Sequence, residues 1–283
     1  MDRMLRGLIV TGFGVATTLL TAAGLVVLEL RYDCAIYSFV YAFVLPLGAF
    51  LSGLVAASGY YVGSKLLSYR PGRGMLAVLL AISGANFFLI YWLKYVYLTV
   101  DGRAVHDSMT FPAYLTFTLS HTSMTTGPGS GDAIELGWAG YLFAALLIAG
   151  FALGGLCIYA IVRSAPYCDA CGLYLKKKGS QTRYFVGKND LAACNAAMRS
   201  AMDRSHFREA MRLHAVSGSR EIGESSGYSL RAGVSQCAGC GKQWLELSAK
   251  QRVNKSWNHL AGFRYSAYCT ESIDVLEQLA GSS

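Results

Sequence analysis

Charge is the property that this sequence has least of. Charged residues make up 15% of the 283 positions, whereas soluble domains carry roughly 25%. The shortage falls on residues 1–162, which contain 8 of the 25 Lys and Arg residues and 7 of the 17 Asp and Glu residues. The other 17 basic and 10 acidic residues lie in 163–283 and supply 17 − 10 = +7 of the formal charge of +8. The composition therefore indicates two different halves: a membrane-type half followed by a basic, water-exposed half.

Several chemical signatures are also missing. The sequence shows no nucleophile–base constellation, no phosphate-binding loop and no paired carboxylates in an apolar run, so no reaction class is indicated. No acidic residue lies at the middle of such a run, where a proton- or ion-coupled transporter is expected to have one. Of the four scattered cysteines only Cys34 falls in a segment expected outside, so a disulfide framework is not indicated and metal binding in a reducing compartment is favoured.

Four apolar runs are long enough to cross a bilayer at about 1.5 Å per residue. We expect them at about 8–28, 36–63, 75–98 and 138–162. The first run exceeds the ~7–15-residue core of a signal peptide and is interpreted as a retained span. Pro46 is expected to kink the second run. A four-helix transmembrane domain is thus predicted for residues 1–162, with 99–137 as one long loop.

The distribution of Lys and Arg predicts the orientation, because cytoplasmic loops hold an excess of both. The residues that mark the N-terminus and the second connection as cytoplasmic are Arg3, Arg6, Lys65, Arg70 and Arg73. The loop 99–137 holds only Arg103 beside four acidic residues, so we expect it outside. Both termini are then cytoplasmic, and the cell inner membrane is the expected location.

Two polar side chains fall inside the third run. Asn86 lies near its middle, and Lys94 lies about one turn from its outer end among four aromatic residues. Lys94 could contact a substrate or an ion, but the favoured interpretation is a side chain that snorkels to the interface within an aromatic belt. Asn86 is interpreted as an interhelical hydrogen-bonding residue rather than a pore ligand.

Small residues recur four positions apart in the second and fourth runs. This spacing lets helix backbones approach closely, which matters because lipid supplies no hydrophobic drive between helices. Packing within the chain is the favoured interpretation, and a homo-oligomer is the second expectation. The residues concerned are Gly53, Ala57, Gly59, Gly63, Gly150 and Gly154.

The strongest motif is a matched pair of sequences in the basic half, Cys168-Asp-Ala-Cys171-Gly172 and Cys237-Ala-Gly-Cys240-Gly241. Two thiolates two residues apart on a tight turn can reach one ion, and the glycine permits the turn. Two such turns complete a tetrahedral four-sulfur shell, which predicts a structural Zn²⁺ ion rather than a catalytic one. A dithiol redox site also uses Cys-x-x-Cys, but both pairs fall on the expected cytoplasmic side, which favours a metal.

These turns resemble the knuckles of the zinc-ribbon superfamily. The resemblance covers the knuckles and the strand-prone stretches Leu173–Leu175, Arg183–Val186, Tyr228–Leu230 and Gln243–Leu247, and not the apolar runs. The 65 residues between Cys171 and Cys237 exceed what a simple ribbon needs, which predicts a helical insert at about 189–216. The expected fold class is an α-helical membrane protein, with a four-span bundle followed by a small cytoplasmic α+β zinc-ribbon domain in 163–283.

The basic half suggests three kinds of partner. A lysine cluster within about ten residues of the bilayer can attract anionic headgroups, and four arginines at about helical spacing predict a basic helix face. We favour the lipid bilayer as partner, then a cytoplasmic protein, and nucleic acid least. The residues are Lys176, Lys177, Lys178, Arg199, Arg204, Arg208 and Arg212.

The leading hypothesis is a non-enzymatic multi-pass membrane protein that acts as a sensor, scaffold or signal relay through a zinc-stabilised cytoplasmic domain. About five residues separate the fourth apolar run from Cys168, so a shift in that helix must move the first knuckle. The first alternative is a homo-oligomeric channel or pore. The second is a membrane enzyme that acts on lipid or on a cytoplasmic substrate.

Overall fold

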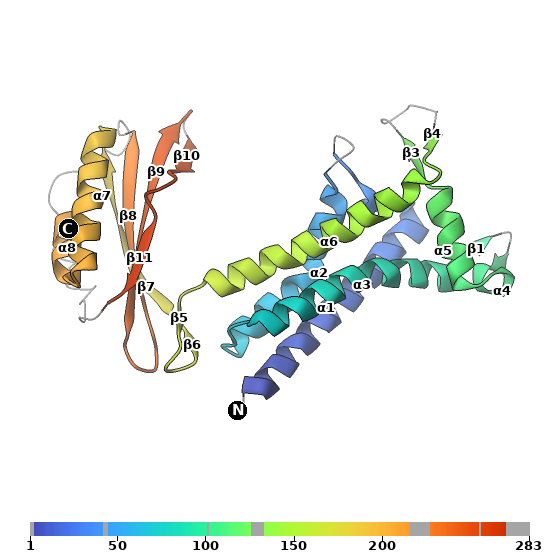
Figure 1. Cartoon of the computed structure of the whole chain (residues 1–283), viewed down its shortest axis with the longest axis horizontal. Helices are drawn as coiled ribbons and strands as arrows, with labels where there is room; N and C mark the ends of the chain where they lie inside the picture. The colour runs from blue at the N-terminus through green and yellow to red at the C-terminus, as the bar shows by residue number, and fades with distance from the viewer. Residues whose placement is uncertain are drawn as a thin grey trace. The chain divides into compact units, whose positions relative to one another are not determined.

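The computed structural model describes residues 3–41, 45–100, 102–125, 133–215, 227–254 and 256–269. It divides into two compact units, Met1–Ala165 and Pro166–Ser283. The first unit is largely helical and the second is built on an antiparallel sheet (Figure 1). The division falls three residues beyond position 162, where the composition changes.

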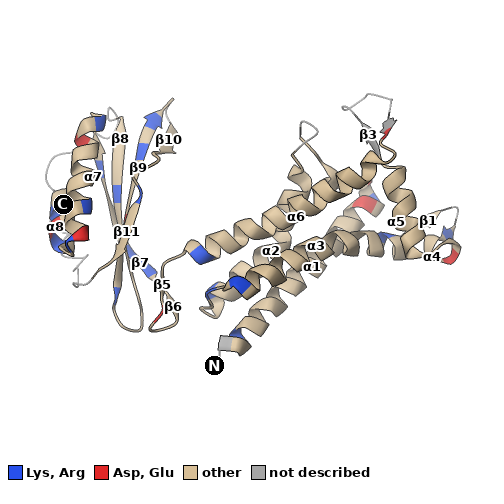
Figure 2. Cartoon of the chain, viewed as in Figure 1, with Lys and Arg blue, Asp and Glu red and all other residues tan. Residues whose placement is uncertain are grey.

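Four long helices form the first unit, and they run alongside one another (Figure 1). They are α1 (Arg3–Tyr32), α2 (Leu47–Leu66), α3 (Arg73–Tyr97) and α6 (Ala139–Ser164). Shorter elements connect them: η1 (Ile36–Ser38), β1 (Thr99–Val100), β2 (Arg103–Ala104), α4 (Val105–Ser108), α5 (Phe111–Ser120), β3 (Ser123–Thr125) and β4 (Ala133–Glu135). Lys and Arg on the long helices lie near the helix ends (Figure 2), as expected of segments whose middles avoid charge.

Three of these helices are long and apolar enough to cross a membrane: Met4–Tyr32, Arg73–Tyr97 and Ala139–Ser164. They contain the first, third and fourth predicted runs. The described part of the chain therefore carries three candidate spans and not four, and this corrects the sequence-based count.

The second predicted run is where the structure differs. Residues 36–63 do not form one helix, because α2 begins at Leu47, directly after Pro46 at its N-cap. Proline lacks a backbone N–H and is tolerated at a helix start, so Pro46 begins the helix instead of kinking it. α2 also has four glycines and three serines among its 20 residues, and it is not among the helices that are apolar enough along a membrane-spanning length.

Close backbone contacts account for the small residues of α2 and α6. A Cβ atom on Gly154 would lie 2.5 Å from the carbonyl oxygen of Phe50, and one on Gly59 would lie 2.3 Å from that of Phe13 in α1. Larger side chains at either position would force the helices apart. Gly53, Ala57, Gly63 and Gly150 are also in contact or buried inside this unit. A homo-oligomer would therefore have to use other surfaces.

A five-stranded antiparallel sheet forms the second unit, in the order β10–β9–β8–β7, with β11 also paired to β9. The strands are β7 (Lys176–Phe185), β8 (Tyr228–Gln236), β9 (Gln243–Val253), β10 (Ser256–His259) and β11 (Tyr265–Tyr268). A separate short ladder pairs β5 (Tyr167–Cys168) with β6 (Leu173–Tyr174). The strand-prone stretches noted in the sequence lie in or next to β6, β7, β8 and β9.

Two helices between β7 and β8 cover one face of this sheet (Figure 1). They are α7 (Lys188–Asp203) and α8 (Phe207–Ala215), and residue 216 lies outside the described part. Every second residue of β8 and β9 faces them, because side chains alternate along a strand. The core contains Leu230, Ala232, Val234, Leu245, Leu247 and Ala249 from the strands and Leu191, Met198, Phe207 and Met211 from the helices.

Candidate metal centre and a buried ion pair

The two cysteine turns meet in the second unit. Cys168 ends β5 and Cys171 lies in the turn before β6, whereas Cys237 and Cys240 lie in the turn between β8 and β9. All four Sγ atoms lie within 4.8 Å of one another. Cys168 and Cys237 are buried, and Cys240 is exposed. The structure thus assembles the four cysteines that the spacing singled out, and together they could hold a metal ion.

The sulfur spacing fits a metal ion better than a disulfide. Cys168 Sγ and Cys240 Sγ lie 3.6 Å apart, and every cysteine of the chain is free. A disulfide needs about 2.05 Å. Four sulfurs at about 2.3 Å from a tetrahedral zinc ion lie about 3.8 Å from one another. Four thiols are also a donor set that zinc binds well.

Glycine gives both turns the same backbone. Gly172 and Gly241 follow the second cysteine of each motif and have φ values of +66° and +71°, in the left-handed region that other residues seldom adopt. Their N–H groups donate to the carbonyl oxygens of Cys168 at 2.8 Å and Cys237 at 3.1 Å. Each turn is therefore closed by its own glycine and presents two thiols from one loop.

A third glycine lets the two turns approach each other. A Cβ atom on Gly239 would lie 3.0 Å from Cys171 Sγ in the opposite turn. The Gly239 N–H also donates to Cys237 Sγ at 3.4 Å. The second turn therefore needs glycine here for space, and the backbone amide of this residue also reaches sulfur.

Backbone amides lower the pKa of one thiol of the cluster, and neighbouring sulfurs raise the pKa of another. The N–H groups of Cys240 and then Gly239 lower the pKa of Cys237 to about 7, because they stabilise its thiolate. Hydrogen bonds with Cys240 and Cys237 raise the pKa of Cys171 to about 12. Four thiolates this close repel one another, and a divalent cation bound between them removes that repulsion. The electrostatics of the cluster therefore favour a cation.

Apolar and aromatic side chains enclose the cysteines. Leu173, Leu175, Trp244 and Tyr268 pack around them. The Tyr268 hydroxyl donates to the carbonyl oxygen of Tyr167 at 2.5 Å, which ties β11 to β5. Such surroundings orient metal ligands and limit access of water. The cluster is thus the point where three chain segments of the unit meet, 167–175, 237–244 and the strand that carries Tyr268.

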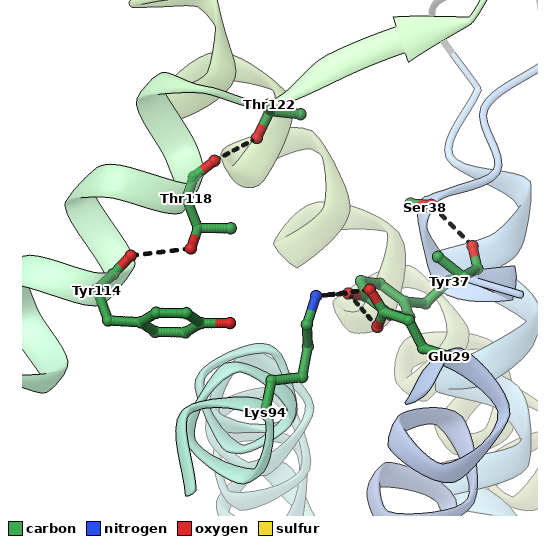
Figure 3. Close-up of polar contacts among 8 residues, drawn as sticks. Glu29, Tyr37, Ser38, Lys94, Tyr114, Thr118 and Thr122 are labelled. Atoms are coloured by element: carbon green, nitrogen blue, oxygen red, sulfur yellow. Dashed lines mark hydrogen bonds and ion pairs between the residues drawn. The ribbon is translucent and has the colours of Figure 1, made fainter. Parts of the chain in front are cut away.

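A second polar site lies in the first unit, where the C-terminal ends of α1 and α3 meet (Figure 3). Lys94 Nζ lies 2.6 Å from Glu29 Oε1, and the two side chains are only 13% and 17% exposed. The Tyr37 hydroxyl donates to Glu29 Oε2 at 3.0 Å. Lys94 is therefore an ion-paired residue, and the expectation of a snorkelling side chain is corrected. A mostly buried ammonium needs its counter-charge close by.

Glu29 and Tyr37 are residues that the sequence pattern does not single out. Glu29 lies just past the apolar run 8–28, but α1 continues to Tyr32 and carries Glu29 alongside α3. A signal was present nonetheless, because a lysine within an apolar segment usually pairs with an acidic group. Tyr114 of α5 also extends toward this ion pair (Figure 3).

Asn86 is the other polar residue of the third predicted run. It is 1% exposed, and neither Oδ1 nor Nδ2 has a hydrogen-bond partner among the described residues. The expected interhelical hydrogen bond is therefore not formed. An unpaired buried amide costs about 1–3 kcal/mol, so Asn86 is a local destabilising feature of α3.

The predicted basic residues do not form one surface. The insert breaks between Asp203 and Phe207, so the arginines of the predicted basic face are divided between α7, the turn and α8. Arg199 lies half-buried over the ring of Tyr265 at 4.9 Å. The exposed members are Lys176, Lys177, Lys178, Arg204, Arg208 and Arg212.

Comparisons with known proteins identify no relative: no family model, no curated protein and no solved structure matches this chain.

Proposed function

We propose that this chain is a non-enzymatic multi-pass membrane protein whose second unit is a zinc-ribbon domain held by one structural Zn²⁺ ion. The observation that carries the proposal is the four-cysteine cluster and its place in the chain. Cys168 follows the end of α6 at Ser164 by four residues. A metal bound there links the chain that leaves α6 to the turn between β8 and β9. Four thiolate ligands leave no coordination position for water or substrate, which supports a structural role.

The helices of the first unit support membrane residence. Three are long and apolar enough to cross a bilayer, and α2, at 20 residues or about 30 Å, packs against α1 and α6 through its glycines. Although α2 is not itself one of the three candidate spans, we infer from this length and packing that it crosses the bilayer with its neighbours. After four crossings the C-terminal end of α6 lies on the same side as the N-terminus. The distribution of Lys and Arg predicts that this side is the cytoplasm, and we propose the cell inner membrane as the location.

The short connection supports a role as a sensor, scaffold or relay. Only Ala165 and Pro166 separate α6 from β5, and proline restricts its own φ and the residue before it. A rotation or shift of α6 would therefore move the first cysteine turn by a similar amount. The metal then passes it to the rest of the second unit, where a cytoplasmic protein would bind.

Crosslinking in cells tests this proposal. The full-length chain would be purified after crosslinking as the wild type, as Cys240→Ser, and as the control Cys34→Ser, whose exposed thiol lies outside the cluster. Quantitative mass spectrometry would compare the attached proteins. We expect a cytoplasmic partner with the wild type and the control, and its loss with Cys240→Ser. A wild-type chain with no cytoplasmic partner, or equal capture by all three chains, would overturn the relay.

A further inference from the structure

The sheet of the second unit has two chemically different faces. Cross-strand partners share a face, and Arg231 pairs with Ser248 while Gly233 pairs with Glu246. Their neighbours Leu230, Ala232 and Leu247 are buried under α7 and α8. We call the opposite side the open face, defined by Arg231, Gly233 and Ser235 of β8 and Glu246, Ser248 and Lys250 of β9.

Positive charge gathers on the open face. Register places Lys177 opposite Ser235 and Trp257 opposite Arg252, so Lys177 and Arg252 join Arg231 and Lys250 there. Arg264 also belongs to this side, because it pairs with Glu246 at 2.9 Å. Among the described residues of these strands and their flanks, five cations therefore face a single acid, a balance of 5 − 1 = +4. Such a face attracts an anionic partner.

A groove runs across this face. It has a volume of about 680 Å³, and its lining includes Lys177, Arg231 and Arg264. Ser235 and Ser248 add hydroxyls, and the segment His259–Gly262 forms one wall. Arg231 donates to the neutral hydroxyl of Ser180 at 3.1 Å, so that contact leaves its charge uncompensated. Cations with hydroxyls are the groups that bind phosphate oxygens.

Aromatic rings stand at both ends of the open face. Tyr184 and Trp257 pack together at 5.8 Å at one end, and Trp244 and Tyr268 pack at 4.5 Å at the other. The rows of these pairs are six residues apart along β8, or about 20 Å. All four rings are half-buried. Tyrosine and tryptophan are the residues that gather at the boundary between lipid and water.

We propose that the open face binds the headgroups of anionic phospholipids and so docks the second unit on the membrane surface. The proposal rests on the proposed function in one respect, that the first unit spans a bilayer. Because β5 begins three residues after α6 ends, the open face is held at high effective concentration near that surface, and modest affinity suffices. Each cation near an anionic leaflet adds about fivefold to the binding constant. Single-stranded nucleic acid would bind through the same charges and rings, and tryptophan fluorescence distinguishes binding to nucleic acid from binding to lipid.

Tryptophan fluorescence in nanodiscs tests the proposal on the full-length chain. Trp92→Phe and Trp138→Phe leave only Trp244 and Trp257, which both lie on the open face. The nanodiscs would contain lipids brominated near the headgroup, either phosphatidylcholine alone or with about 30% phosphatidylglycerol. We expect quenching with the anionic mixture and little with phosphatidylcholine alone. No difference between the two would overturn the proposal.

A matched pair of triple variants assigns the effect to the open face. Lys177→Gln, Arg231→Gln and Lys250→Gln remove three charges from it. The apparent affinity for anionic lipid, measured from the quenching, should fall by up to about 100-fold. Arg204→Gln, Arg208→Gln and Arg212→Gln remove three charges from the exposed helical side and should change little. Three Arg or Lys exchanges on the open face (Lys177→Arg, Arg231→Lys, Lys250→Arg) control for folding and should keep the effect.

Two further readouts separate the alternatives. A change in fluorescence with a single-stranded oligonucleotide, without lipid quenching, would overturn the proposal in favour of nucleic acid. Zinc content and recovery in nanodiscs are measured on the same sample. A chain that enters nanodiscs with its metal but shows no quenching refutes only the docking. A chain that does not enter them refutes the membrane proposal itself.

Discussion

Different interactions stabilise the interior of each of the two units of this chain. In the first, helix backbones touch at glycines such as Gly59 and Gly154, and one ion pair joins α1 to α3. In the second, a core of alternating strand residues lies under two helices, and four cysteines meet at its edge. We therefore expect the first unit to depend on close backbone packing, and the second unit on the metal ion that its four cysteines could hold. Each dependence can be broken without touching the other.

Metal removal should have the largest effect, and only on the second unit. A structural zinc ion contributes about 10–16 kcal/mol of apparent binding energy to small zinc domains, more than a small domain's own stability of about 5–15 kcal/mol. Cys237→Ser or a strong chelator should therefore make residues 166–269 sensitive to limited proteolysis. The helices of the first unit should stay resistant. A second unit that remains resistant without metal would contradict this comparison.

Breaking the buried ion pair should come next, and only in the first unit. Lys94→Met leaves Glu29 without its partner, and the loss of one member of a mostly buried pair costs about 3 kcal/mol. Thermal unfolding in detergent should show it. Adding Glu29→Gln should restore much of the loss, because no unpaired charge remains. Equal unfolding temperatures for the single and double variants would mean that the pair contributes no coupling.

A single methyl group on a glycine should cost somewhat less. Gly154→Ala places a Cβ atom 2.5 Å from a carbonyl oxygen of α2, and overpacking of this kind costs about 1–3 kcal/mol. Gly24→Ala is the matched control, because nothing lies within 4 Å of a Cβ at that position of α1. The same detergent unfolding assay compares the two. If both variants lose stability equally, the helices are not held by backbone contact.

Protonation of His214 should give the smallest effect, and in the second unit. His214 is 2% exposed; its Nε2–H donates to Leu230 O at 3.0 Å, and its Nδ1 lies 3.4 Å from Gln181 Oε1. Burial lowers its pKa below 6.5. The unfolded chain therefore takes up a proton near pH 6.5 that the folded chain refuses, and stability falls as pH drops below that value. Urea unfolding of the wild type and of His214→Gln would be compared at pH 7.5 and 6.0. His214 should account for under about 1 kcal/mol of the wild type's loss, and the larger loss from protonation of the metal-binding thiolates should be common to both chains.

The sequence predicted most where the signal is local. The four clustered cysteines follow from two five-residue motifs, and three apolar helices follow from runs with at most one charge. The start of α2 could have been read from Pro46, because proline favours a helix start over a helix interior. The basic open face could also have been found, since Arg231 of β8 and Ser248 and Lys250 of β9 each follow an apolar residue at the period of a strand.

What could not be predicted depends on contacts between distant segments. Glu29 and Lys94 are 65 residues apart, and no local pattern states that α1 runs one turn past its apolar part. The approach of Gly239 to Cys171 likewise appears only when both turns are in place. His214 looks like any polar residue near a helix end until the sheet covers it.

One metal ion, bound by four cysteines, is proposed to close the second unit. X-ray absorption at the zinc edge, together with metal analysis of the purified full-length chain, tests this most directly. We expect one zinc per chain with four sulfur neighbours at about 2.3 Å, and none in Cys168→Ser. A folded wild-type chain without zinc, or a zinc ion with nitrogen or oxygen neighbours in place of a sulfur, would contradict it.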